Sequence, residues 1–110
     1  MKETIAGDWH CVAKTNEVLE DEPKAVQIGN DYIALYKIDD RFYATDDICT
    51  HEFASLAEGF VDGDCIECPL HAGKFHIPTG KAMTAPVTED LRTFPVKVEG
   101  DDIYVRLVKS

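Results

Sequence analysis

Two short motifs that each pair a cysteine with a histidine are the residues of this chain best suited to chemistry. They are Cys49-Thr50-His51 and Cys68-Pro69-Leu70-His71, and sixteen residues, 52 to 67, separate them. Two ligands that lie one or two residues apart in a tight loop can converge on one metal centre, and two such loops can hold it from opposite sides. The candidate ligands are therefore Cys49, His51, Cys68 and His71.

This set of two thiolates and two imidazoles suits two kinds of metal centre. Zinc accepts two sulfurs and two nitrogens, so a structural zinc module that serves as an interaction domain is one interpretation. A two-iron cluster is the other, with Cys49 and Cys68 on one iron and His51 and His71 on the second. Because neutral imidazoles replace two thiolates, the reduction potential of such a cluster rises. The site would then carry single electrons at a moderate potential.

The two motifs resemble the cluster loops of Rieske proteins, and the second motif continues as Ala72-Gly73-Lys74-Phe75. The pattern of strands on both sides extends the likeness over nearly the whole chain. The resemblance implies a Rieske-type 2Fe-2S cluster bound by Cys49, His51, Cys68 and His71. It also implies an all-β fold, with antiparallel sheets or a β-sandwich and a small, loop-rich lobe that binds the cluster.

Within that family, the chain is most similar to the small ferredoxins of bacterial aromatic-ring-hydroxylating dioxygenase systems. Its 110 residues leave no room for a catalytic domain. High-potential respiratory Rieske proteins have an extra cysteine in each cluster loop, where this chain has Ala54 and Leu70. The resemblance implies an electron carrier rather than an enzyme, which docks transiently with a ferredoxin reductase and a terminal oxygenase. The small Rieske-type subunit of an assimilatory nitrite reductase is the alternative with the same cluster.

The chain departs from the pattern of these ferredoxins at two positions in the cluster loops. Glu52 follows the first histidine, where a glycine is common, and Ala72 stands in the second loop where a glycine is often found. A carboxylate beside the iron bound by histidines favours the oxidised cluster, since that form carries less negative charge. We therefore expect Glu52 to lower the reduction potential unless its side chain points into solvent.

The two remaining cysteines are interpreted as packing residues rather than as ligands. Cys65 forms a C-x-x-C motif with Cys68, a spacing that redox disulfides and zinc ribbons also use. A second such pair is missing from the sequence, so we expect Cys65 to be a small apolar side chain in a strand. Cys11, between His10 and Val12, is expected to pack in the same way.

The two remaining histidines are expected to lie at the surface. His76 should turn to the opposite face of its strand from Phe75 and Ile77, because side chains alternate along a strand. His10 has no candidate ligand near it in the sequence. An oxygenase would also need a mononuclear iron site, with two histidines and a carboxylate beyond the cluster ligands. Only His10 and His76 remain, and no motif joins them, so we do not expect the chain to be the oxygenase itself.

Short runs rich in valine, isoleucine, tyrosine and phenylalanine recur between turn signals and predict a β protein. The predicted strands are 9–12, 24–28, 32–38, 41–44, 65–67, 74–77, 94–99 and 103–107, with a short helix or loop at 55–59. Glycine and aspartate mark turns at 29–31, 39–40, 78–80 and 100–102. We expect a single domain, 1–110, in which a cluster-binding lobe of about 46–80 is inserted in a larger β base.

The charge of the chain bears on its partners. Eleven basic and 21 acidic residues give a net charge of -10, which argues against binding to nucleic acid or to an anionic membrane. Positively charged protein surfaces are the expected partners. Five carboxylates near the ligands are candidates for a ring that steers docking, and Leu70, Phe53 and Phe75 are candidates for an apolar patch around the histidines. For Phe75 the core is the favoured place, because it is in phase with Ile77 along its strand. The five carboxylates are Glu52, Glu58, Asp62, Asp64 and Glu67.

Composition supports a folded chain of ordinary globular character. Hydrophobic residues make up 45% and charged residues 29% of the sequence, which are common values for globular domains. The start of the chain, Met1-Lys2-Glu3-Thr4, is followed by no apolar stretch of signal-peptide or membrane length. We therefore expect a monomeric cytoplasmic protein whose thiols stay reduced.

Overall fold

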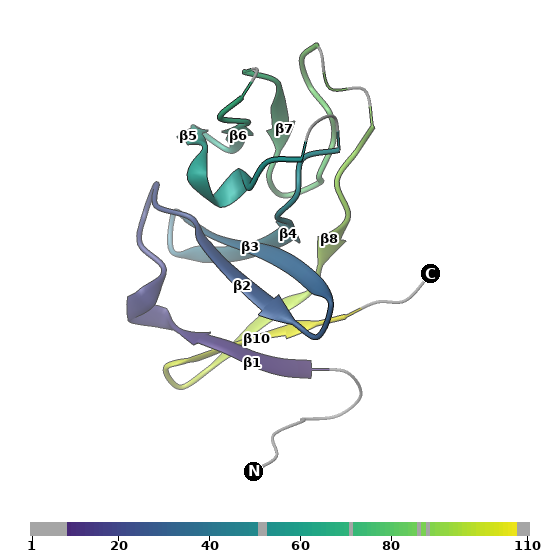
Figure 1. The fold of residues 1–110 in the computed structure, drawn as a ribbon. Helices are drawn as coiled ribbons and strands as arrows, with labels where there is room; N and C mark the ends of the chain where they lie inside the picture. Colours follow the sequence, from purple (N-terminus) through teal and green to yellow (C-terminus); the bar gives the residue numbers. More distant parts are fainter. Residues whose placement is uncertain (1–8, 51–52, 71, 86, 88, 108–110) are drawn as a thin grey trace.

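The computed structural model describes residues 9–50, 53–70, 72–85, 87 and 89–107, and it confirms the all-β prediction (Figure 1). These residues form ten strands and two short 3-10 helices, and no helix among them is long and apolar enough to cross a membrane. In chain order the elements are β1 (Trp9–Lys14), η1 (Thr15–Glu17), β2 (Lys24–Ile28), β3 (Asp31–Ile38), β4 (Arg41–Asp46), η2 (Leu56–Glu58), β5 (Phe60–Asp62), β6 (Cys65–Glu67), β7 (Lys74–His76), β8 (Thr93–Phe94), β9 (Val96–Glu99) and β10 (Asp102–Arg106).

The strands form three antiparallel sheets, in the orders β1-β10-β9, β2-β3-β4-β8 and β5-β6-β7. Figure 1 shows them as successive layers, with the four-stranded sheet in the middle. We call the first two sheets the base. We call residues 46–80, which contain β5 to β7, the lobe, and residues 81–91, which lead from the lobe back to β8, the covering segment.

Strand β3 lies between two clusters of buried side chains and contributes residues to both. Ile33 and Leu35 pack in the cluster between the two sheets of the base, whereas Ala34 and Tyr36 pack in the cluster beneath the lobe. All four side chains are buried, as expected of a strand covered on both faces. The unbroken apolar run from 33 to 36 thus follows from the place of β3 in the middle of the molecule.

The hairpins of the base use residues that tolerate a left-handed backbone. Asp39 and Asp40 join β3 to β4 with φ values of +51° and +67°, the pattern of a two-residue turn in which both residues have positive φ. Gly29 and Gly100 have φ of +59° and +61° in the turns before β3 and β10. The predicted turns at these three places are therefore confirmed, and they set the register of the sheets.

Two strand predictions were wrong for identifiable reasons. The stretch 94–99 was predicted as one strand, but it divides at Pro95 into β8 in the middle sheet and β9 in the outer sheet. Proline cannot donate a ladder hydrogen bond, so the chain changes sheets there. The three-residue strand β5 was not predicted, because its short run of Phe60, Val61 and Asp62 resembles a turn region in the sequence.

Cys11 is exposed, so its predicted packing role was wrong. The pairing of β1 with β10 shifts register between Cys11 and Ala13. A bulge at this point places the two residues on different faces of the strand, although they are two positions apart. Ala13 is buried in the base, and Cys11 faces solvent.

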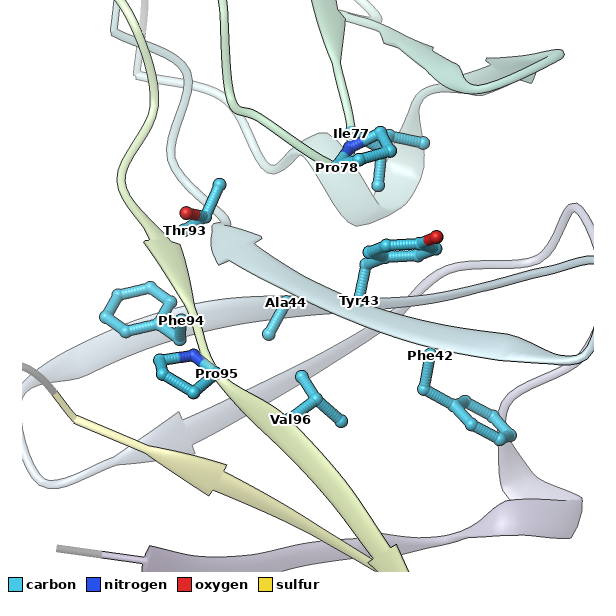
Figure 2. A pocket seen from close by; sticks show the side chains of 9 residues that line it. All are labelled: Phe42, Tyr43, Ala44, Ile77, Pro78, Thr93, Phe94, Pro95 and Val96. Carbon is cyan, nitrogen blue, oxygen red and sulfur yellow. The ribbon is translucent and has the colours of Figure 1, made fainter.

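An apolar hollow of about 540 Å³ lies where the base meets the end of the lobe (Figure 2). Phe42, Phe94 and Pro95 line it from the base, and Ile77 and Pro78 line it from the lobe. None of its lining residues carries a thiol, an imidazole or a carboxylate. The hollow is therefore part of the junction between base and lobe and is separate from the candidate metal centre.

Candidate metal centre

Cys49 and Cys68 lie in the same buried cluster, although 18 residues separate them in the sequence. Their exposed fractions are 4% and 1%. Apolar side chains of the lobe surround them, among them Leu56, Ile66 and Phe75. The candidate ligands His51 and His71 lie outside the described residues. The structure thus brings together the two candidate sulfur ligands from separate loops.

A buried carboxylate organises the loop that carries Cys49. The Oδ2 atom of Asp47 accepts a hydrogen bond of 2.7 Å from the Ser55 hydroxyl, and its Oδ1 accepts one of 2.9 Å from the Ala57 backbone N–H. The backbone N–H of Cys49 donates to the carbonyl of Ala54 at 3.0 Å. Asp47 is only 4% exposed. Two donors, one O–H and one N–H, thus satisfy a carboxylate that would otherwise be costly to bury, and they hold Asp47 against Ser55 and Ala57.

Sequence reasoning missed the role of Asp47. It stands at the end of a stretch, 39–47, in which three other aspartates and no glutamate occur, and acidic runs of this kind are usually solvated. Its position directly before the apolar Ile48 and the candidate ligand Cys49 was the available signal. A carboxylate next to a buried loop residue often accepts hydrogen bonds from that loop rather than facing water.

The loop that carries Cys68 is a tight turn. The N–H of Cys68 donates to the carbonyl of Gly73 at 2.8 Å, and the N–H of Ala72 donates to the carbonyl of Cys68 at 3.1 Å. Ala72 has a φ of +63°, a left-handed conformation that glycine adopts at much lower cost. The departure noted at this position in the sequence is therefore a backbone conformation that alanine adopts under strain.

The covering segment is joined to both parts of the centre by hydrogen bonds. The N–H of Met83 donates to the carbonyl of Lys74 at 2.8 Å, and the N–H of Lys74 donates to the Thr84 hydroxyl at 2.9 Å. The Thr50 hydroxyl, between the candidate ligands of the first loop, donates to the carbonyl of Glu89 at 2.7 Å. The segment therefore bonds to the first loop and to β7. Pro86, which was expected to shape a covering loop, lies outside the described residues.

Gly80 and Leu91 close the segment at its base. The N–H of Leu91 donates to the carbonyl of Gly80 at 2.7 Å, and Leu91 itself is buried beside the two cysteines. Gly80 has a φ of +76°, and a Cβ placed on it would lie 2.3 Å from the Leu91 carbonyl oxygen. Gly63 also has a positive φ, of +63°, but nothing lies near it. Gly63 therefore serves a turn, whereas Gly80 allows two chain segments to approach each other.

His76 has polar partners on both sides of its ring, which corrects the prediction of a simply solvated residue. Its Nδ1 lies 2.9 Å from the Thr79 hydroxyl, and its Nε2 lies 3.0 Å from Oδ2 of Asp64. The alternation that placed it opposite Phe75 and Ile77 is confirmed, since both of those side chains are fully buried. His76 therefore links β7 to the turn before β6 on the outer face of the lobe.

Cys65 lies on the rim of the lobe and is half-buried, so the predicted packing role is met only in part. Burial, and then the neighbouring Asp64 carboxylate, raise the pKa of its thiol. A raised pKa keeps the thiol protonated and makes it a poor nucleophile and a poor metal ligand. Within the described residues Cys65 forms no disulfide.

The predicted ring of carboxylates is partly neutralised by cations of the lobe. Lys74 Nζ lies 2.8 Å from Oδ2 of Asp62, and this hydrogen bond lowers the pKa of the Asp62 carboxyl and raises the pKa of Lys74. Asp64 faces His76. Glu58 remains exposed, and Glu52 lies outside the described residues. The acidic character around the centre is therefore weaker than the sequence suggested.

Two of the three residues of the predicted apolar patch are exposed. Phe53 is 89% and Leu70 is 64% exposed, and each belongs to one of the two candidate ligand loops. Phe75 is fully buried and takes part in the core instead. Exposed apolar side chains that gather in one patch are typical of a surface that another molecule covers, so Phe53 and Leu70 remain the candidates for such a patch.

The described residues fit a metal centre with sulfur ligands. A thiolate buried among apolar side chains needs a cation beside it, because an isolated buried charge is costly. Two such thiols at the ends of two tight loops, each two or three residues before a histidine, supply that arrangement. Within the described part of the chain, no three thiol, imidazole or carboxylate side chains gather as a metal site. The other two predicted ligands, His51 and His71, lie outside this part of the chain.

Comparison with known proteins finds a matching family, similar sequences and similar structures. Residues 8–95 match the family described as the Rieske 2Fe-2S domain. The ferredoxin component of the naphthalene 1,2-dioxygenase and salicylate 5-hydroxylase systems of Ralstonia sp. is 39% identical over 100 residues, which is 91% of this chain and 96% of that protein.

Two solved structures are also similar. The ferredoxin of Sphingomonas yanoikuyae B1 has a TM-score of 0.85 at 34% identity, covering 89% of this chain and 97% of that one. A chain of the complex of reduced oxygenase and oxidised ferredoxin in carbazole 1,9a-dioxygenase has a TM-score of 0.85 at 40% identity, covering 90% and 93%.

Proposed function

Because this chain belongs to the family of Rieske 2Fe-2S proteins, we propose that it carries single electrons from a ferredoxin reductase to a terminal oxygenase that hydroxylates aromatic rings. It is a ferredoxin of the kind that serves multicomponent dioxygenases, and thus an electron carrier rather than an enzyme. The family assignment favours an iron–sulfur cluster over a structural zinc ion. The dioxygenase relatives also favour this function over that of a nitrite reductase subunit.

We propose that Cys49 and Cys68 bind one iron of the cluster and that His51 and His71 bind the other. The observation that supports this most directly is the burial of Cys49 and Cys68 in one apolar cluster, at the ends of separate loops. Bound there, the cluster accepts and releases one electron, and its imidazole ligands set a higher potential than four thiolates would. The apolar surroundings limit access of water to the sulfur ligands.

The residues of the lobe supply the docking surface in this proposal. Phe53 and Leu70 flank the proposed histidine ligands in the sequence and offer exposed apolar surface to a partner. The interface would be small and short-lived, as is common for redox encounters. The net charge of -10 favours approach to a positively charged surface. The solved complex of a similar ferredoxin with its oxygenase is a precedent for such docking.

We further propose that the chain is one domain, with the lobe inserted in the base, and that it works as a monomer in the cytoplasm. The core cluster beneath the lobe includes Ala34 and Tyr36 of the base, which supports a single folding unit. A reducing compartment suits a chain with an exposed thiol at Cys11. Size-exclusion chromatography under reducing conditions measures the oligomeric state.

The first experiment is to record the visible absorption and EPR spectra of the purified protein before and after reduction with dithionite. A Rieske cluster gives a red-brown protein whose reduced form has an EPR signal of low average g. We expect Cys49→Ser and Cys68→Ser to abolish this signal, and the matched controls Cys65→Ser and Cys11→Ser to keep it. A colourless wild-type protein with stoichiometric zinc would overturn the proposed function.

The second experiment tests the direction of electron flow. The reduced ferredoxin is mixed with a terminal dioxygenase of the type that its relatives serve, and oxidation of the cluster is followed by stopped-flow absorption. We expect Phe53→Ser and Leu70→Ser to slow this transfer while the EPR signal stays unchanged. Transfer at the wild-type rate by both variants would remove the docking surface from the proposal.

A further inference from the structure

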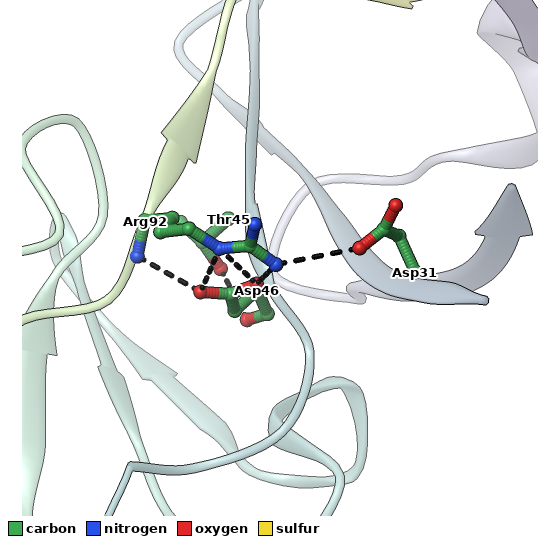
Figure 3. Close-up of polar contacts among 4 residues, drawn as sticks. All are labelled: Asp31, Thr45, Asp46 and Arg92. Carbon is green, nitrogen blue, oxygen red and sulfur yellow. Dashed lines mark hydrogen bonds and ion pairs between the residues drawn. The ribbon is translucent and has the colours of Figure 1, made fainter. Parts of the chain in front are cut away.

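The chain enters and leaves the lobe at two adjacent points of the base. It enters at Asp46, the last residue of β4 and three positions before Cys49. It returns at Arg92, which follows the covering segment and directly precedes β8. Figure 3 shows the side chains of Asp46 and Arg92 facing each other across this gap. Any shift between the two residues would also displace the covering segment relative to the first loop.

Asp46 and Arg92 extend the pairing of β4 with β8 by one further step. The last strand pair is Thr45 with Thr93, and beyond it the N–H of Asp46 donates to the carbonyl of Arg92 at 3.0 Å. In return, the N–H of Arg92 donates to Oδ2 of the Asp46 carboxylate at 3.0 Å. A side-chain oxygen thus takes the place that a backbone carbonyl would have in a regular ladder.

The guanidinium of Arg92 holds the same carboxylate from outside. Its Nη2 donates to Oδ1 of Asp46 at 2.8 Å, and its Nε lies 3.1 Å from both oxygens. Hydrogen bonding with Asp46 is the main cause that raises the pKa of Arg92. The side chain of Arg92 is 56% exposed and that of Asp46 is 19% exposed, so the pair lies at the surface with its carboxylate partly shielded from water. Its strength comes from the bidentate geometry of the guanidinium and the carboxylate.

Further contacts fix each partner in one orientation. Nη2 of Arg92 also lies 3.5 Å from Oδ1 of Asp31 on β3, and its Cζ lies 5.3 Å from the centre of the Phe94 ring. On the other side, the Thr45 hydroxyl donates to the carbonyl of Asp46 at 2.8 Å. The buried Tyr36 hydroxyl, whose pKa burial raises, lies 2.9 Å from the Thr45 oxygen. The pair is thus held from the core as well as from the surface.

The residues next to this pair connect it to the candidate metal centre. Asp47, directly after Asp46, organises the loop of Cys49 through its carboxylate. Leu91, directly before Arg92, is buried in the cluster that contains both cysteines. Neither member of the pair belongs to that buried cluster. Any effect of the pair on the centre would therefore pass through these two neighbours.

We propose that Asp46 and Arg92 are positioning residues, which fix the first ligand loop and the covering segment relative to each other and thereby set the environment of the cluster. This inference rests on the proposed function. It assigns a role in electron transfer to residues that sequence reasoning did not single out. The fork of Arg92 matters as well as its charge, because it bonds both oxygens of one carboxylate in a fixed geometry.

The test compares Arg92→Ala and Arg92→Lys with Arg41→Ala, in an otherwise unchanged chain. Arg41 is an exposed arginine at the opposite end of β4, so it is the matched control. For Arg92→Ala we expect altered g values of the reduced cluster, a shifted midpoint potential and roughly ten-fold faster loss of the cluster in air. Arg92→Lys should fall between the wild type and Arg92→Ala, and Arg41→Ala should match the wild type.

A lower melting temperature for Arg92→Ala, with wild-type g values, potential and cluster lifetime, would overturn the inference and leave a merely structural pair. Hydrogen exchange of residues 47–56 and 81–91 provides a readout that does not depend on the cluster. We expect faster exchange in both segments of Arg92→Ala, and unchanged exchange would also overturn the inference. A wild-type protein without a Rieske signal would instead refute the proposed function, while the exchange comparison would still test the positioning role.

Discussion

The base and the lobe are stabilised by different means. The base is a pair of sheets with strands of up to eight residues, continuous pairing and a core between the sheets. In the lobe, β5, β6 and β7 have three residues each, and many loop contacts use side chains such as Asp47, Thr50 and Thr84. A three-residue strand offers few ladder hydrogen bonds and little apolar surface. The lobe therefore combines a buried apolar cluster with individual polar contacts and an iron–sulfur cluster, whereas the base relies on its longer strands and the core between its sheets.

Removal of the cluster is expected to separate the two regions most clearly. If the buried cysteines Cys49 and Cys68 bind the iron–sulfur cluster, as proposed, its removal takes away the partner that fixes both loops, and part of the folding free energy of the lobe is lost with it. We expect amide exchange in β5 to β7 to accelerate by several orders of magnitude in the apo protein, while β3 and β10 keep their protection. Equal acceleration in lobe and base would show that they unfold together and would remove the contrast.

A matched pair of core substitutions tests the same contrast in the holoprotein. Ile66 on β6 and Ile103 on β10 are both fully buried. Ile66 lies in the apolar core beneath the lobe, and Ile103 lies in the core between the two sheets of the base. Truncation to alanine is expected to cost about 2–5 kcal/mol of unfolding free energy at either site. Ile66→Ala should also speed loss of the visible absorption of the cluster, whereas Ile103→Ala should leave the lifetime of the cluster in the folded protein unchanged. Equal lifetimes of the iron–sulfur cluster in Ile66→Ala and Ile103→Ala, in buffer without denaturant, would contradict this prediction.

Two glycines with positive φ give a second matched pair. Alanine at Gly100, in an open hairpin of the base, is expected to cost about 1–2 kcal/mol from its left-handed backbone alone. Alanine at Gly80 should cost about 1–3 kcal/mol more, because its Cβ would collide with the Leu91 carbonyl. Urea unfolding measures both values. If the two variants lost equal stability, the close approach of Gly80 to the Leu91 carbonyl would not contribute to the cost of the substitution.

The smallest expected effect is a gain of stability in the lobe. Ala72→Gly relieves a left-handed alanine, which costs about 1–2 kcal/mol, but it also raises the entropy of the unfolded chain by about 0.4–1 kcal/mol. We expect a net stabilisation of about 0.5–1 kcal/mol, measured by the urea midpoint of the holoprotein. A loss of stability would mean that the methyl group of Ala72 makes contacts of greater value than the strain.

The same contrast explains how much could be predicted from the sequence. In the base, apolar runs and glycine or aspartate turns predicted the strands well. The predicted bounds of β2 match the observed ones, and those of β3 and β4 lie within two residues of them. In the lobe, the candidate ligands and the burial of Phe75 could be predicted, because a motif and the alternation of side chains are local signals in the sequence. Asp47 and Arg92 were missed, since their roles depend on partners 8 to 61 residues away. A hydrogen bond between distant segments leaves no periodic pattern in the sequence.

The pairing of β1 with β10 has a practical consequence for building devices from this protein. Trp9 lies opposite Arg106, so these two strands meet in the outer sheet of the base, at the pole away from the lobe (Figure 1). The start of β1 and the end of β10 thus lie side by side in a sheet that the middle sheet separates from the lobe. If the lobe carries the docking surface, as proposed, a flexible linker attached at either of these strand ends would fix the molecule to an electrode or to a redox partner and leave that surface accessible.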